Sequence, residues 1–203
     1  LLGLVGSEMC IRDSNNYVDN DETLKMLQKM SINLAASGSD ILAPSDMMDG
    51  RIGAIRSDLE AAGHKDTILL SYSSKFSSNF YGPFREAVGS KRKQGISKKT
   101  YQMDYRNSKE ALMKAEMDIN EGADILMVKP AMPNSDIIHS LSENYSIPIF
   151  AYQVSGEYSM IQLGIDKKIF DNNVIDESLI TLFRAGAKSV LCLLYTSDAA
   201  DDP

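Results

Sequence analysis

Short apolar runs that alternate with segments of helical spacing are the feature of this sequence that most limits its fold. Five of these runs have the length of a β-strand, and they cover Asp40–Pro44, Thr67–Tyr72, Asp124–Lys129, Ile147–Val154 and Ser189–Leu191. Their apolar residues are consecutive rather than alternating, which is typical of strands that are buried on both faces of a parallel sheet. The sequence therefore predicts an α/β protein with a parallel sheet.

The segments between these runs carry the start and stop signals of helices. Asp21–Ala36 repeats apolar residues at helical spacing after an acidic first turn, where negative charge stabilises a helix. Asn107–Ser108 precede a helix expected over Glu110–Asn120, which Gly122 is expected to end. The last predicted helix lies within Asp176–Gly186. Repeated strand–helix units predict a doubly wound sheet or a (β/α)8 barrel. The sequence has no GxGxxG motif after a strand, so the dinucleotide-binding type of doubly wound sheet has no support.

Composition excludes several classes of protein. The 203 residues carry a formal net charge of -7, so the chain lacks the excess of Lys and Arg that binds nucleic-acid phosphates. No stretch reaches the roughly 18 consecutive apolar residues that span a membrane, and we expect a cytoplasmic protein. The cysteines are Cys10 and Cys192 and the histidines are His64 and His139, a set that predicts neither a disulfide framework nor a metal-binding cluster.

The two ends of the sequence differ from the region between them. Residues 1–14 show neither helical nor strand periodicity, and the strand–helix rhythm stops after Leu191 in a tail that runs to Pro203. We therefore interpret residues 1–14 and 192–203 as foreign flanks and residues 15–191 as the natural segment.

Two lysines stand at positions where a charged side chain is costly to bury. Lys129 ends an apolar run, and Lys75 follows the run Thr67–Tyr72 after only two residues. At the C-terminal ends of parallel strands, both side chains are expected to point into the mouth of a barrel. Burial and a second cation each lower the pKa of a lysine, and the neutral amine attacks a ketone to form a Schiff base. We expect burial to act most strongly on Lys129; the alternative is a lysine that extends from the strand end to solvent.

Five motifs occur between residues 43 and 158. They are APSDMMDGRIGAIR (Ala43–Arg56), SYSSKFSSNFYGPFR (Ser71–Arg85), KTYQMD (Lys99–Asp104), GADILMVKPAMP (Gly122–Pro133) and AYQVSGEY (Ala151–Tyr158). In this order and at these spacings they resemble the porphobilinogen synthase (delta-aminolevulinic acid dehydratase) family, and the resemblance covers residues 15–191. It implies a (β/α)8 TIM barrel, of which this chain would hold the C-terminal part with about five βα units. It also implies the condensation of two 5-aminolevulinate molecules into porphobilinogen, a step of tetrapyrrole and heme biosynthesis.

The resemblance assigns roles to ten residues. Lys75 and Lys129 match the two Schiff-base lysines of the family, Lys75 for the substrate that contributes the propionate side. The ligands expected for substrate carboxylates are Arg85, Lys98 and Ser155. The residues expected to line the pocket are Phe80, Tyr81 and Gln102. Ser45 and Asp46 resemble the support for the lysines, although the run that contains them equally predicts a turn that caps the next helix.

The resemblance also bears on cofactors and partners. The family's metal-binding segment lies upstream of residue 15. Zinc or magnesium is therefore expected for the full-length protein, and no metal ligand is expected among the residues present. Many bacterial members bind an allosteric magnesium through a glutamate, and Lys114 stands at that position here, with Glu116 nearby. The intact parent is expected to be a homo-oligomer, typically an octamer, that binds the small molecule 5-aminolevulinate, no nucleic acid and no membrane.

Two other functions are compatible with parts of the sequence. A class I aldolase also forms a Schiff base, but it usually needs one such lysine. A non-catalytic interaction module would leave a lysine at the end of an apolar strand without a role. The pairing of Lys75 and Lys129 with Arg85 and Lys98 favours the dehydratase. As a fragment, the chain is expected neither to fold stably by itself nor to form porphobilinogen.

Overall fold

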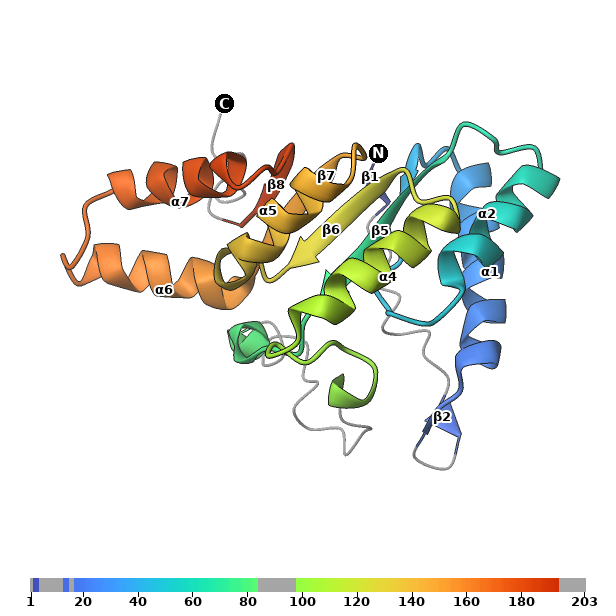
Figure 1. Ribbon diagram of the computed structural model, residues 1–203, viewed down its shortest axis with the longest axis horizontal. Helices are drawn as coiled ribbons and strands as arrows, with labels where there is room; N and C mark the ends of the chain where they lie inside the picture. Colours follow the sequence, from blue (N-terminus) through green and yellow to red (C-terminus); the bar gives the residue numbers. More distant parts are fainter. Residues whose placement is uncertain (1, 4–12, 15–16, 84–97, 194–203) are drawn as a thin grey trace. The chain divides into compact units, whose positions relative to one another are not determined.

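The computed structural model describes residues 2–3, 13–14, 17–83 and 98–193 (Figure 1). The chain divides into two compact units, the first made of residues 1–75 and 95–127 and the second of residues 76–94 and 128–203. Strand β6 (Ile125–Lys129) begins in the first unit and ends in the second. Among the residues described, no helix is long and apolar enough to cross a lipid bilayer.

The first unit is built on parallel strands. These are β1 (Leu2–Gly3), β4 (Ile41–Leu42), β5 (Ile68–Lys75) and the beginning of β6, in this order. β4 and β5 pair in parallel, with Ile41 opposite Ile68. The helices of this unit are α1 (Asn20–Ala36), α2 (Arg51–Ala61), α4 (Ser108–Asn120) and the short 3-10 helix η3 (Lys98–Thr100). A short antiparallel pair, β2 (Asp13–Ser14) and β3 (Tyr17–Val18), precedes α1.

The core of the first unit follows the predicted pattern. The residues of β5 after Ile68 are all buried, as expected for a strand that is covered on both faces. Helix α2 buries Ile52, Ile55 and Leu59 at helical spacing, and α1 packs against α2. Each fully buried aliphatic side chain contributes about 1.5–3 kcal/mol relative to exposure. This packing fixes β5, and therefore also fixes the residue at its carboxyl end.

The second unit continues the same alternation. The end of β6 is followed in strand order by β7 (Ile149–Gln153) and β8 (Ser189–Cys192). β7 and β8 pair in parallel, with Ala151 opposite Val190, and the Ala131 N–H donates to the Tyr152 carbonyl at 2.9 Å. The helices are η2 (Asn79–Tyr81), η4 (Met132–Asn134), α5 (Ser135–Asn144), α6 (Ser155–Asp166) and α7 (Asn173–Arg184).

The predicted parallel α/β architecture is confirmed, with differences at the ends of some elements. β5 does not end at Tyr72 but continues to Lys75, because the intervening serines are small enough to remain buried in the strand. Helix α4 begins at Ser108, and α7 begins at Asn173, three residues before the expected start. Gly122 and Gly186 follow α4 and α7 with φ of 98° and 116°, the left-handed conformation that ends helices and favours glycine.

Candidate active site

Lys75 is the last residue of β5 and is almost completely buried, with 2% of its surface exposed. Its ammonium group donates to the Ser45 carbonyl at 2.5 Å and lies 5.8 Å from the centre of the Tyr72 ring. The Lys75 carbonyl accepts from the Met103 N–H at 3.1 Å, which places the segment after η3 beside the end of β5. Burial disfavours the charged form of an amine, so this environment suits a lysine that must react as a neutral amine.

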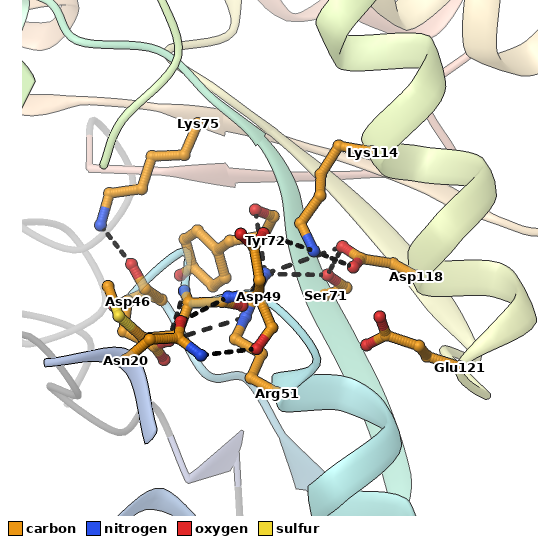
Figure 2. Close-up of polar contacts among 12 residues, drawn as sticks. Asn20, Asp46, Asp49, Arg51, Ser71, Tyr72, Lys75, Lys114, Asp118 and Glu121 are labelled. Atoms are coloured by element: carbon orange, nitrogen blue, oxygen red, sulfur yellow. Dashed lines mark hydrogen bonds and ion pairs between the residues drawn. The ribbon is translucent and has the colours of Figure 1, made fainter. Parts of the chain in front are cut away.

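Arg51 lies between the turn at Asp46 and strand β5 (Figure 2). Its guanidinium is fully buried and donates to the Met48 carbonyl at 3.1 Å and to two groups of β5, the Ser71 hydroxyl at 3.0 Å and the Tyr72 carbonyl at 3.2 Å. Asp46 accepts from the Met48 N–H at 2.9 Å within the same turn. The turn is therefore tied to β5 by hydrogen bonds that only a planar, multiply donating side chain can make at once.

Two further charged side chains, Asp118 and Lys114, lie near Arg51 (Figure 2). The buried Asp118 carboxylate accepts from the Ser71 hydroxyl and from the Lys114 ammonium, the latter at 2.7 Å, and lies 3.8 Å from the Arg51 guanidinium. Lys114 is also 4.0 Å from Asp49. Lys114, which stands where the resemblance implies a magnesium-binding glutamate, therefore forms ion pairs with carboxylates, and an ammonium group cannot ligate a cation.

The Ser45–Asp46 run does not cap the next helix. Helix α2 has Gly50 with φ 74° as its N-cap and no side-chain cap, and Asp46 instead accepts from the Met48 N–H within the turn. Ser45 contacts Lys75 through its carbonyl. The turn is thus part of the surroundings of Lys75, and the supporting role stays a prediction.

Several buried polar atoms of the first unit have no hydrogen-bond partner among the described residues. They are Asp46 Oδ2, Arg51 Nε, Ser73 Oγ, Ser74 Oγ and both side-chain atoms of Gln102. Leaving a buried polar atom unpaired costs roughly 1–3 kcal/mol, so such atoms are suited to bind a polar ligand or water. Ser73 and Ser74 were not predicted as site residues, since β5 was expected to end before them.

Lys129 is the last residue of β6 and belongs to the second unit. Its ammonium group lies 4.0 Å from the centre of the Tyr152 ring and 5.7 Å from that of Tyr81. Its carbonyl accepts from the Phe76 N–H at 2.9 Å and from the Tyr81 hydroxyl at 3.2 Å. Aromatic faces attract a cation and displace water around it, so Lys129 has an amphipathic environment that differs from that of Lys75.

The expectation that burial acts most strongly on Lys129 is wrong. Lys75 is the more buried of the two lysines, whereas Lys129 is only half-buried. The apolar residues before Lys129 are buried in β6, but their burial does not extend to the strand's last side chain. At Lys75 the turn at Ser45 covers the strand end, a contact between distant segments that periodicity does not reveal.

The remaining predicted residues are placed individually. Tyr81 lies beside Lys129, and Ser155 is the first residue of α6. Phe80 belongs to η2, and its backbone lies against Gly156. Lys98 is half-buried in the first unit, where its carbonyl accepts from the Gln102 N–H at 2.9 Å. Arg85 lies outside the described residues.

Glu157 is a buried acidic residue near Lys129 that the sequence pattern did not single out. It is fully buried in the first turn of α6, and its carboxylate accepts from the N–H groups of Val154 and Met132. Burial raises the pKa of Glu157 to about 7, against the opposing effect of these N–H groups and of Lys129. The motif AYQVSGEY contains it, but an acidic residue in the first turn of a helix is usually a surface residue that stabilises the helix dipole.

Comparison with known proteins identifies the family. The family model of delta-aminolevulinic acid dehydratase matches residues 5–201. Curated delta-aminolevulinic acid dehydratases from Methanothermus sociabilis and Rhodobacter capsulatus are 51% and 52% identical over 177 and 187 residues. These matches cover 87% and 92% of this chain but 55% and 56% of the relatives, so the chain spans about half the length of the curated relatives it matches.

A solved structure agrees with these relatives. The dehydratase from Toxoplasma gondii ME49, in complex with the reaction product porphobilinogen, is 44% identical with a TM-score of 0.88, over 94% of this chain and 54% of that one. The predicted fold class, an incomplete barrel of the (β/α)8 family, is confirmed by this likeness. On the sequence match, the relatives and the shared fold together, the chain belongs to the delta-aminolevulinic acid dehydratase family.

Proposed function

We propose that the protein to which this chain contributes condenses two molecules of 5-aminolevulinate into porphobilinogen, with the loss of two waters, as a hydro-lyase of tetrapyrrole biosynthesis. The observation that carries the proposal is the position of Lys75 and Lys129 at the carboxyl ends of buried parallel strands in a chain of this family. A relative with the same fold has been solved with porphobilinogen bound. A class I aldolase, which needs one Schiff-base lysine, explains neither the second lysine nor the family match.

The chemistry proposed for each lysine is the same. The neutral amine attacks the ketone carbon of 5-aminolevulinate, and the resulting carbinolamine loses water to give an imine. Protonation of the imine makes it an electron sink, which activates the neighbouring carbon for bond formation. Lys75 lies in a buried polar environment that includes the Ser45 carbonyl. Lys129 lies over the ring of Tyr152, and burial raises the pKa of that tyrosine.

The other predicted residues are proposed to hold and enclose the substrates. Charge-assisted hydrogen bonds to a carboxylate are among the stronger polar contacts, and we assign them to Arg85, Lys98 and Ser155. Phe80, Tyr81 and Gln102 are proposed to line the pocket, and Ser45 and Asp46 to support Lys75. The unpaired buried atoms of Asp46 and Gln102 support this assignment, because a polar substrate offers them partners.

The metal, assembly and compartment stay predictions. Among the described residues no group of three or more His, Cys, Asp or Glu side chains could hold a metal ion, so we assign no step of the reaction to zinc or magnesium. A homo-octamer is expected from the family alone. The cytoplasm is expected from composition, and the similar proteins include a chloroplastic dehydratase from Spinacia oleracea, 52% identical over 178 residues, 87% of this chain and 41% of that protein.

The experiment is an activity measurement on a completed enzyme, in which the Rhodobacter capsulatus dehydratase supplies the part of the chain that this sequence does not cover. With 5-aminolevulinate as the substrate, the completed enzyme is expected to form porphobilinogen. The 203-residue chain alone is expected to form none, since a (β/α)8 barrel needs eight strands. A completed enzyme that folds and binds 5-aminolevulinate, yet releases no porphobilinogen, would contradict the proposal.

A further inference from the structure

Glu157 connects two backbone segments that carry predicted site residues. One carboxylate oxygen accepts from the Val154 N–H at 2.5 Å, and Val154 directly precedes Ser155. The other oxygen accepts from the Met132 N–H at 2.6 Å, three residues after Lys129. Both oxygens of one fully buried side chain are therefore used to join the segment after β6 to the start of α6.

The start of α6 is also fixed from a second direction. A Cβ atom on Gly156 would lie 2.3 Å from the Phe80 carbonyl oxygen and 2.7 Å from the Phe80 Cα, so the backbones of α6 and η2 touch there. The residue after Phe80 is Tyr81, whose hydroxyl donates to the Lys129 carbonyl. The start of α6, η2 and the end of β6 are thus in mutual contact, and Glu157 is a buried carboxylate within this arrangement.

We propose that Glu157 is a positioning residue for Lys129 and Ser155, and that its carboxylate must be ionised for Lys129 to be held in its reactive place. The inference rests on the proposed function and deepens it. It assigns to the second Schiff-base lysine a buried acidic partner that acts through the backbone rather than by touching the substrate.

The protonation state of Glu157 decides how well it can connect the two segments. An ionised carboxylate offers acceptor sites on both oxygens, whereas a protonated one turns one oxygen into a donor. Burial raises the pKa of Glu157 to about 7, with the N–H groups of Val154, Met132 and Ala131 and the charge of Lys129 acting in the opposite direction. Among the described residues, the rings of Tyr152 and Tyr81 lie beside the Lys129 ammonium group, and burial raises the pKa of Tyr152.

The test is reductive trapping of the imine on the completed enzyme. The completed enzyme is incubated with 5-aminolevulinate and cyanoborohydride between pH 6 and pH 8, and the labelled lysines are identified by mass spectrometry. The yield at Lys129 is divided by that at Lys75, which belongs to the other unit and cancels the effect of pH on the reagent. For a group that titrates near pH 7, the ionised fraction changes about tenfold over this range, so the ratio is expected to rise by a similar factor.

The variants decide between positioning and simple packing. Glu157→Gln keeps the size of the side chain and is expected to give a ratio that does not change with pH, while Glu157→Asp retains the pH dependence. Glu143→Gln makes the same chemical change at an exposed position of α5 and is expected to behave as the wild type. An unchanged pH profile in Glu157→Gln would overturn the inference. So would a loss of Lys129 labelling at every pH in both Glu157→Gln and Glu157→Asp, since the carboxylate would then be required only for packing.

Failure of the inference and failure of the proposed function are distinguishable. If neither Lys75 nor Lys129 is labelled in the wild-type completed enzyme, the proposed function is overturned and the inference falls with it. If both are labelled and only the predicted pH dependence is missing, the function stands and the role of Glu157 does not.

Discussion

Lys75 and Lys129 are proposed to perform the same reaction in different surroundings. Lys75, in the first unit, is almost completely buried and donates to a backbone carbonyl, in a turn fixed by the Arg51–Asp118–Lys114 ion-pair cluster. Lys129, in the second unit, is half-buried and lies over the ring of Tyr152. One lysine is surrounded by hydrogen bonds and paired charges, the other by aromatic rings and a backbone connection through Glu157.

The difference shows that a reactive amine can be prepared in two ways. Around Lys75 the low exposure itself disfavours the ammonium form, and the nearby turn is fixed by the ion pairs of Arg51 with Asp46 and Asp118. Around Lys129 the aromatic faces exclude water while they still tolerate a cation, which suits a protonated imine. Changes in the surroundings of the two lysines should therefore have different effects on the enzyme. Removal of either lysine itself should lower turnover to a similar extent.

The largest effect is expected from removal of either lysine in the completed enzyme. Lys75→Ala and Lys129→Ala should each lower kcat by about a thousandfold or more, because each removes a covalent intermediate. Lys167→Ala, at an exposed position after α6, serves as the control and should leave kcat unchanged. Retention of more than about a tenth of the turnover by either variant, a loss under ~1.4 kcal/mol, would remove that lysine from the mechanism.

Loss of Arg51 is expected to affect the surroundings of Lys75 alone. Arg51→Met removes the cation that pairs with the buried Asp46, and leaves the buried Asp118 paired with Lys114. Removal of one partner of a buried ion pair costs about 3–5 kcal/mol. Urea unfolding of the completed enzyme measures the loss. Arg106→Met, which removes an exposed ion pair with Asp104, is the matched control and should cost far less, because water screens exposed pairs. Equal costs for the two variants would mean that the cluster around Arg51 does not stabilise the unit.

The surroundings of Lys129 should instead be sensitive to pH. The folded-state pKa of Glu157 is about 7 against 4.5 for the ordinary group, so between these values the folded chain binds the extra proton. The stabilisation is present below about pH 4.5 and is lost as pH rises to about 7, and it amounts to at most about 3 kcal/mol. The free energy of unfolding of the wild type minus that of Glu157→Gln should fall over this window. A constant difference would show that Glu157 titrates normally.

A smaller effect is expected at the contact between α6 and η2. Gly156→Ala places a Cβ atom 2.3 Å from the Phe80 carbonyl, and overpacking of this kind costs about 1–3 kcal/mol. Gly53→Ala in α2 is the control, since the nearest atom to its Cβ position belongs to the flexible Glu121 side chain, at 3.4 Å. Thermal unfolding should separate the two variants. If Gly156→Ala unfolds at the temperature of Gly53→Ala, the two backbones are not in contact.

Much of the fold could be predicted because burial on both faces leaves a clear pattern. The run Asp124–Lys129 contains β6 almost residue for residue, and Gly122 ends α4 as expected. The end of β5 was placed too early because Ser73 and Ser74 interrupt the apolar run, although both are buried in the strand. Apolar periodicity cannot detect a strand whose last residues are small, buried and polar.

The site could be predicted less completely, because its parts meet only in three dimensions. The resemblance identified Lys75, Lys129 and Tyr81, but the contact between Lys75 and the Ser45 carbonyl joins residues 30 positions apart. Glu157 was missed for the same reason, since its Met132 partner is 25 positions away. Local pattern describes a residue's own element, whereas burial of a single carboxylate depends on the loops that fold over it.

The most direct measurement identifies every lysine of residues 17–193 that 5-aminolevulinate labels in the completed enzyme under cyanoborohydride. The proposal predicts adducts on both Lys75 and Lys129 and none on Lys65 or Lys167, exposed lysines of the first and second unit. An adduct on only one of the two buried-strand lysines would favour aldolase-like chemistry with a single Schiff base. Labelling spread over Lys65 and Lys167 as well would contradict the claim that the ends of β5 and β6 prepare two reactive amines.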